Sequence, residues 1–188
     1  FRSEIHLSIK MILGINSQNH DASMALIDGR DILWAAHAER YSQVKNDVQL
    51  NKQIIADMRL YGEPERIVWF ERPWLKNFRR LYSGQRPWIV DPHDELKRLG
   101  LDHLPVDFVT HHESHAAAGF YTSGFEDASV LVVDAIGEWN SVTIWQADSN
   151  GLKCQWKKNY PNSIGLFYTA FTQYVGLRSE EHTSELQS

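Results

Sequence analysis

Three histidines within five positions are the residues of this sequence best suited to metal chemistry. They lie in the string His111-His112-Glu113-Ser114-His115. On a helix, His111 and His115 would share one face, at a spacing that lets two imidazoles bind one ion. His112 and His115, three positions apart, form a competing pair. The alternative is a solvated loop in which Ser114 caps the helix that follows.

A carboxylate further along the chain could complete such a site. Asp134 ends an apolar run that starts at Val130, which we expect to be a strand ending at a ligand-binding face. Two imidazole nitrogens and one carboxylate oxygen, with open positions, suit Fe(II) or another divalent ion. Asp134 could instead cap the turn that follows it. Glu138, beyond that turn, is either a turn residue or a residue behind the site.

A second polar cluster lies near the N-terminus. The tripeptide Asn19-His20-Asp21 falls in the expected turn between the first two strands. Such a turn can bring backbone amides and polar side chains to a phosphate or substrate, although an ordinary hairpin turn explains it equally well. Lys45, in the string AERYSQVKND, could bind an anionic group beside this turn or could simply lie on an exposed strand end.

The elements that must position these residues can be read from hydrophobic periodicity. Short apolar or alternating runs predict strands, and apolar residues at helical spacing predict helices. The expected strands are 11–16, 22–28, 32–39, 67–70, 106–110, 130–134, 141–146 and 152–156, and the expected helices are 51–61, 74–82, 94–99 and 115–121.

The two expected three-strand meanders are related by a shift of 118 positions, which places Asn16 on Asp134 and Ser23 on Ser141. This layout predicts an internal duplication and an α/β fold of the actin-like ATPase and sugar-kinase type, with ribonuclease H-like lobes. We expect the first lobe over 11–128 and the start of a second over 129–177. Residues 1–10 are expected to be a non-native leader and 178–188 an adapter-derived tail, which would leave the second lobe truncated.

Composition excludes several classes of function. The net charge of -5, with no basic run interleaved with aromatic residues, argues against nucleic acid as a partner. No apolar stretch is long enough to span a membrane. The lone Cys154, expected to be inert packing, excludes an intrachain disulfide and favours a cytoplasmic location. P-loop, Rossmann and hydrolase-elbow motifs are absent from the sequence.

Several strings together resemble the nodulation-factor and antibiotic O-carbamoyltransferase family: NHDASMALID, AERYSQVKND, WFERPWLKNFRR, HHESHAAAGFY, VLVVDAIGEW and SIGLFYTAFTQYVGL. The resemblance implies that His111, His115 and Asp134 bind a metal, with His112 behind them. It also implies that carbamoyl adenylate is made from carbamoyl phosphate and ATP in a separate C-terminal domain. The carbamoyl group then passes to a hydroxyl acceptor.

The chemistry implied by the family needs a base for the acceptor hydroxyl. His20 is the candidate base, with Asp21 as the second candidate catalytic residue. Lys45 and Glu138 are the candidate cofactor-binding residues. Two alternatives stay open: a related metalloprotein that transfers a threonylcarbamoyl group to tRNA, and a non-catalytic metal- or nucleotide-binding module. The strings AERYSQVKND and WFERPWLK favour the carbamoyltransferase, and we expect this piece alone to be inactive.

Overall fold

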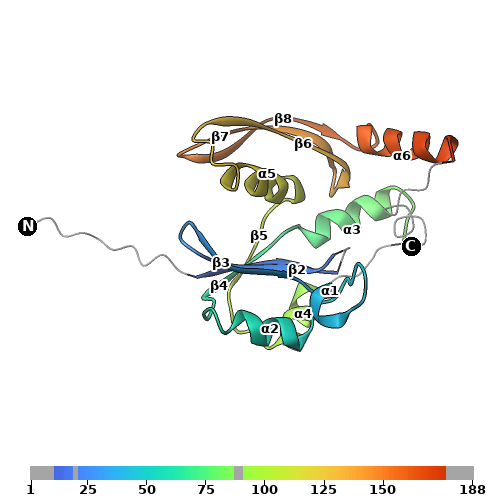
Figure 1. The fold of residues 1–188 in the computed structure, drawn as a ribbon. Coiled ribbons are helices and arrows are strands. Elements are labelled where there is room, and N and C mark those ends of the chain that lie inside the picture. The colour runs from blue at the N-terminus through green and yellow to red at the C-terminus, as the bar shows by residue number, and fades with distance from the viewer. Residues whose placement is uncertain (1–10, 19–20, 87–90, 177–188) are drawn as a thin grey trace, which may run out of the picture. The chain divides into compact units, whose positions relative to one another are not determined.

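The computed structural model describes residues 11–18, 21–86 and 91–176, so the expected leader and tail lie outside the described residues. The chain divides into two compact units, Phe1–Phe70 with Val90–Phe108, and Glu71–Ile89 with Val109–Ser188. Strands and helices occur in both, which confirms the α/β class (Figure 1). The two units exchange chain segments, with divisions before Glu71, Val90 and Val109. The lobe boundaries stay a prediction.

The first unit is built on a five-stranded sheet of order β3-β2-β1-β4-β5. Strands β1 to β3 form the expected antiparallel meander, β4 pairs with β1 in parallel, and β5 pairs with β4 in parallel. The strands are β1 (Ile12–Asn16), β2 (Ser23–Asp28), β3 (Asp31–His37), β4 (Arg66–Trp69) and β5 (Val106–Phe108).

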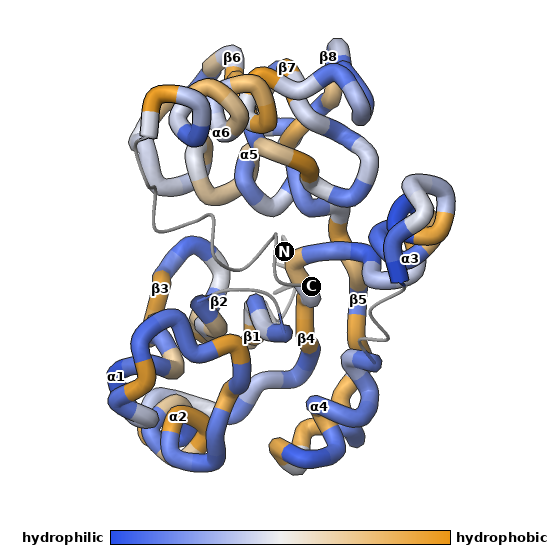
Figure 2. The backbone as a smooth tube through the Cα atoms, turned by 90° about the vertical axis from the view of Figure 1, so that its right-hand side faces the viewer, coloured by the Kyte–Doolittle hydropathy of each residue, from blue (hydrophilic) through white to orange (hydrophobic). Residues whose placement is uncertain are grey.

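One face of this sheet carries the core of the first unit. Alternate residues of β1 are buried, so Leu13 and Ile15 pack with Trp69 of β4 and with apolar side chains of two helices. Burying each such side chain contributes about 1.5–3 kcal/mol. The helices of this unit are α1 (Glu39–Ser42), α2 (Lys52–Met58) and α4 (Pro92–Leu99). Figure 2 shows β4 as a hydrophobic segment, as a buried parallel strand should be.

The second unit contains the other meander, a three-stranded antiparallel sheet of order β6-β7-β8. Its strands are β6 (Ala128–Gly137), β7 (Asn140–Asp148) and β8 (Gly151–Asn159), and its helices are α3 (Pro73–Tyr82), α5 (His111–Tyr121) and α6 (Ile164–Tyr174). Helix α5 lies along one face of this sheet, where Ala116 packs on Val132 and Trp145 (Figure 1). Cys154 is exposed on β8, because this strand presents most of its side chains to solvent. The expectation that Cys154 packs inside is therefore wrong.

Candidate metal centre

The start of helix α5 sets the position of both candidate histidine ligands. Thr110 caps the helix: its hydroxyl accepts from the Glu113 N–H at 3.3 Å, and the Glu113 carboxylate accepts from the Thr110 N–H at 3.4 Å. The helix therefore begins at His111 rather than at the expected residue 115. The alternative role of Ser114 as the cap is wrong, because its hydroxyl donates to the His111 carbonyl inside the first turn.

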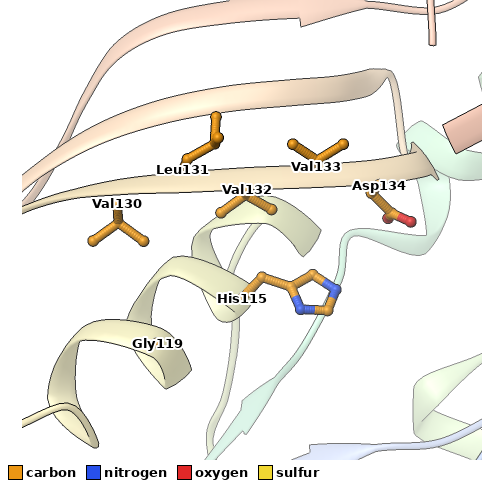
Figure 3. Close-up of a pocket in the computed structure, with 7 residues that line it drawn as sticks. All are labelled: His115, Gly119, Val130, Leu131, Val132, Val133 and Asp134. Atoms are coloured by element: carbon orange, nitrogen blue, oxygen red, sulfur yellow. The ribbon is translucent and has the colours of Figure 1, made fainter. Parts of the chain in front are cut away.

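The structure brings His111, His115 and Asp134 together. The His111 Nε2 atom lies 2.9 Å from Asp134 Oδ2 and 3.1 Å from His115 Nε2. One donor atom from each of the three residues lies within 4.8 Å of the others. An ion with bonds of about 2.0–2.2 Å holds neighbouring ligand atoms roughly 3 Å apart, so these spacings fit a metal. Asp134 stands near the end of β6, and His115 projects from α5 toward the same end of that strand (Figure 3).

Asp134 supplies the negative charge of the cluster. Burial alone would raise the pKa of its carboxyl group, but the hydrogen bond and charge of His111 and the Ala135 N–H outweigh burial and lower the pKa to about 2. Its Oδ1 atom accepts from the Ala135 N–H at 2.6 Å. Asp134 therefore caps the turn with Oδ1 and faces His111 with Oδ2. Asp134 is therefore ionised at neutral pH, and a carboxylate with two histidine nitrogens is a donor set suited to a divalent cation.

His112 points away from this cluster and into the core. It is fully buried, and its Nδ1 atom lies 2.9 Å from the hydroxyl of Thr143, which also accepts from Trp145 Nε1 at 2.7 Å. Burial lowers the pKa of His112 to about 4, although the charge of Asp134 opposes this. Among the described residues, His111, His115 and Asp134 are the group that could hold a metal, so the competing pair of His112 with His115 is wrong.

Gly137, the last residue of β6, and Glu138, which follows it, lie close to His111. A Cβ atom on Gly137 would come within 2.5 Å of His111 Cδ2, so only glycine lets the ring lie this close to the backbone. Glu138 is buried with a left-handed φ of 54°, and its Oε1 atom accepts from the Arg72 N–H at 2.6 Å. Burial raises the pKa of Glu138. Its cofactor-binding role stays a prediction.

Glu71 is the residue near this cluster that sequence reasoning missed. It lies two residues before the start of α3 and is 2% exposed, and its Oε2 atom is 4.0 Å from His111 Nδ1. A single glutamate after a strand carries no periodic or motif signal. Its place beside a histidine far along the chain comes from tertiary packing.

A groove of about 300 Å³ adjoins the cluster, between α5 and β6 (Figure 3). His115 and Asp134 line its polar end, and Gly119 with Val130 and Val132 lines an apolar part. The groove could therefore receive a small molecule with a polar group turned toward the two donors.

The remaining predicted residues belong to the first unit or lie outside the described residues. His20 is among the latter. Asp21 follows the β1 strand with a φ of 53°, and its carbonyl accepts from the Asn16 side chain at 3.2 Å. Lys45 is exposed. In the same segment, the Asp47 carbonyl accepts from the Ala22 N–H at 2.8 Å. Their catalytic and cofactor-binding roles stay predictions. No helix in the described ranges has both the length and the apolar character to cross a membrane.

Comparison with known proteins gives the chain a family context. The family described as Carbamoyltransferase N-terminus matches residues 80–188. The uncharacterized protein sll1178 of Synechocystis sp. is 31% identical over 89% of this chain and 32% of its own length. The uncharacterized protein MJ1051 of Methanocaldococcus jannaschii is 28% identical over 95% of this chain and 32% of its own. Nodulation protein NolNO of Sinorhizobium fredii is 25% identical, over 86% and 26% respectively. The chain thus spans about a third or less of the length of these relatives.

Proposed function

Because the chain belongs to the carbamoyltransferase family, whose N-terminal domain its residues 80–188 match, we propose that it forms the metal-bearing part of an enzyme that transfers a carbamoyl group to a hydroxyl of a sugar or natural product. The convergence of His111, His115 and Asp134 on one ion-sized space is the observation that carries this proposal. Two nitrogen donors and one carboxylate are a set that Fe(II) accepts. The proposal includes the actin-like fold and a cytoplasmic location.

In the proposed reaction, carbamoyl adenylate, formed from carbamoyl phosphate and ATP in a further domain, donates the carbamoyl group. The acceptor oxygen forms a bond to the carbamoyl carbon, the bond from that carbon to the phosphate oxygen breaks, and AMP leaves. A divalent ion, when bound by His111, His115 and Asp134, supplies a Lewis acid for the carbamoyl carbonyl. His20 takes the hydroxyl proton, with Asp21 beside it in sequence. The Lys45 ammonium offsets phosphate charge.

Metal titration tests the centre on which this proposal depends. Fe(II) is added anaerobically to the chain and to two variants, His111→Ala and Asp134→Asn. We expect the parent chain to bind Fe(II) and each variant to bind it more than about 100-fold more weakly. That loss exceeds the one typical of replacing a residue that only orients a ligand. His103→Ala, which changes an exposed histidine of the first unit, should bind as the parent does. Equal affinity in all four proteins would refute the centre.

Carbamoyl transfer from carbamoyl phosphate and ATP is then assayed on this chain and on a chain of the length of its relatives, side by side. Transfer by the longer chain alone is the expected result. Threonylcarbamoyl transfer to tRNA by the longer chain would favour the related metalloprotein instead. Metal binding with neither transfer would favour a non-catalytic module.

A further inference from the structure

Two buried carboxylates lie beside the metal centre, and the proposed reaction gives Glu71 no role. Glu71 and Glu138 are 2% and 4% exposed, and both lie in the second unit with His111. Buried carboxylates are costly to keep unless cations or N–H groups satisfy them. Both therefore need a structural or functional reason, and the geometry around His111 gives one for Glu71.

We propose that Glu71 is a positioning residue of the metal centre, which accepts the Nδ1–H of His111 and so presents the Nε2 lone pair to the ion. This inference rests on the proposed metal centre. A neutral imidazole carries one proton, so a ring that binds an ion through Nε2 must carry that proton on Nδ1. Ligating histidines commonly donate this second N–H to a carboxylate, which fixes the tautomer and the ring orientation.

The two ring nitrogens of His111 face different partners, as this role requires. Its Nε2 atom lies 2.9 Å from Asp134 and 3.1 Å from His115, whereas its Nδ1 atom lies 4.0 Å from Glu71 Oε2. The last distance is about 1 Å longer than a hydrogen bond. Rotation of the glutamate side chain closes that gap when the ion fixes the ring. The ring cannot retreat toward the backbone, because Gly137 already lies against its Cδ2 atom.

Glu71 is itself held in place from two directions. The Lys76 ammonium, in the first turns of α3, lies 3.3 Å from Oε1 and 3.5 Å from Oε2. The next residue, Arg72, donates its N–H to Glu138 at 2.6 Å, which ties this segment to the end of β6. The carboxylate thus has a partner for its charge and a fixed backbone, as an orienting group needs.

The first test is a titration of the 188-residue chain with Co(II), a spectroscopic substitute for Fe(II), monitored by the visible band of the bound ion. Glu71→Gln keeps the shape of the side chain but removes its charge, and should weaken Co(II) binding roughly 10-fold. Glu71→Asp keeps the charge but shortens the reach, and should also weaken binding. The matched control is Glu95→Gln: Glu95 is equally buried, is paired with Arg98 Nη2 at 2.7 Å and lies in the first unit. It should leave Co(II) binding unchanged.

The second test reads the tautomer of the His111 ring directly. In the Zn(II)-loaded chain with 15N-labelled histidine, NMR should show His111 bound through Nε2 with a proton on Nδ1, and Glu71→Gln should shift that proton upfield. Ligation through Nδ1, or unchanged Co(II) affinity in both Glu71 variants, overturns the role of Glu71 while metal binding stands. Failure of the parent chain to bind Co(II) overturns the metal centre itself, and the role of Glu71 with it.

Discussion

Thr143 joins the buried ring of His112 to that of Trp145. Its hydroxyl accepts from Trp145 Nε1 at 2.7 Å and lies 2.9 Å from His112 Nδ1, and all three side chains are buried. A threonine hydroxyl has one proton and two lone pairs, so it can accept from the indole N–H and also pair with His112 Nδ1 in either tautomer of the ring. One side chain thereby satisfies two buried nitrogens and fixes the start of α5 against β7.

Thr143→Val should destabilise the chain by about 2–4 kcal/mol, because it leaves two buried polar atoms without their partner. Urea unfolding followed by tryptophan fluorescence measures the loss. Thr143→Ser retains the hydroxyl and loses one methyl group, so its cost should stay near 1 kcal/mol. Equal losses in the two variants would show that packing, not hydrogen bonding, explains the effect.

A separate prediction concerns Gly137, where the steric space around the backbone matters rather than a hydrogen bond. A methyl group there would meet His111 Cδ2 at 2.5 Å and His112 Cδ2 at 2.6 Å, and the helix start holds both rings in place. Gly137→Ala should therefore cost about 1–3 kcal/mol and weaken Co(II) binding. Gly119→Ala is the control: its added carbon meets only Val130 Cγ1, at 3.8 Å, within a helix where alanine is favoured. A Gly137→Ala chain as stable as the parent would contradict the argument.

The candidate ligands could be predicted from the sequence because helical spacing and a strand end are local features. His111 and His115 share a face in any helix that includes both, and Asp134 follows an apolar run. The burial of Glu71 and the direction of His112 depend on which elements pack together. A single sequence does not contain that information.

Asp57 connects three elements of the first unit. Its Oδ2 atom accepts from Trp34 Nε1 on β3 at 2.9 Å and from the Tyr41 hydroxyl on α1 at 2.5 Å, while Asp57 itself belongs to α2. The hydrogen bonds from Tyr41 and Trp34 lower the pKa of Asp57. Burial, together with Asp57, raises the pKa of Tyr41 to about 12.

These two shifts predict the pH dependence of stability. The Asp57 contribution is present above its ordinary pKa and is lost as the pH falls through the lowered folded value. The Tyr41 contribution is present below pH 10 and is lost as the pH rises toward about 12. Urea midpoints measured from pH 2.5 to 12 should fall less steeply at both ends in Asp57→Asn than in the parent. Asp102→Asn, at an exposed loop position, should keep the parent profile. Parallel curves for the parent and Asp57→Asn would count against the connection.

Most strands and helices were predictable, since apolar periodicity marks the segments that bury one face. The start of α5 was placed four residues too late, although Thr110 and Glu113 form a capping box that the sequence displays. The four polar residues at 111–114 gave no signal for a helix, because hydrophobic periodicity depends on apolar positions alone. Strand β6 extends to Gly137, beyond its apolar run, because the hairpin pairs Gly137 with Asn140.

The two meanders of the chain differ in how their first strands are flanked. In the first unit, β1 lies between β2 and the parallel strand β4. In the described part of the second unit, β6 pairs with β7 alone and is an edge strand. The expected duplication thus matches in strand order and direction within each meander, but the second sheet has an open side. Unpaired edges and exposed apolar faces are the common routes to association between copies.

Helix α6 adds such an apolar face. Phe167, Phe171 and Tyr174 follow one another at helical spacing and are 70%, 56% and 87% exposed, and the two phenylalanine rings stack with centroids 6.3 Å apart. We therefore expect the chain to self-associate as its concentration rises, which sedimentation velocity measures directly. The double variant Phe167→Glu with Phe171→Lys removes the apolar face while adding an ion pair of the favourable helical order, so it should stay folded and sediment as a monomer. Phe125→Ser removes an aromatic side chain that is 68% exposed outside α6 and should leave association unchanged. If Phe125→Ser abolished association as well as the double variant does, general exposure of aromatic side chains would be the cause, and α6 would have no special part in it.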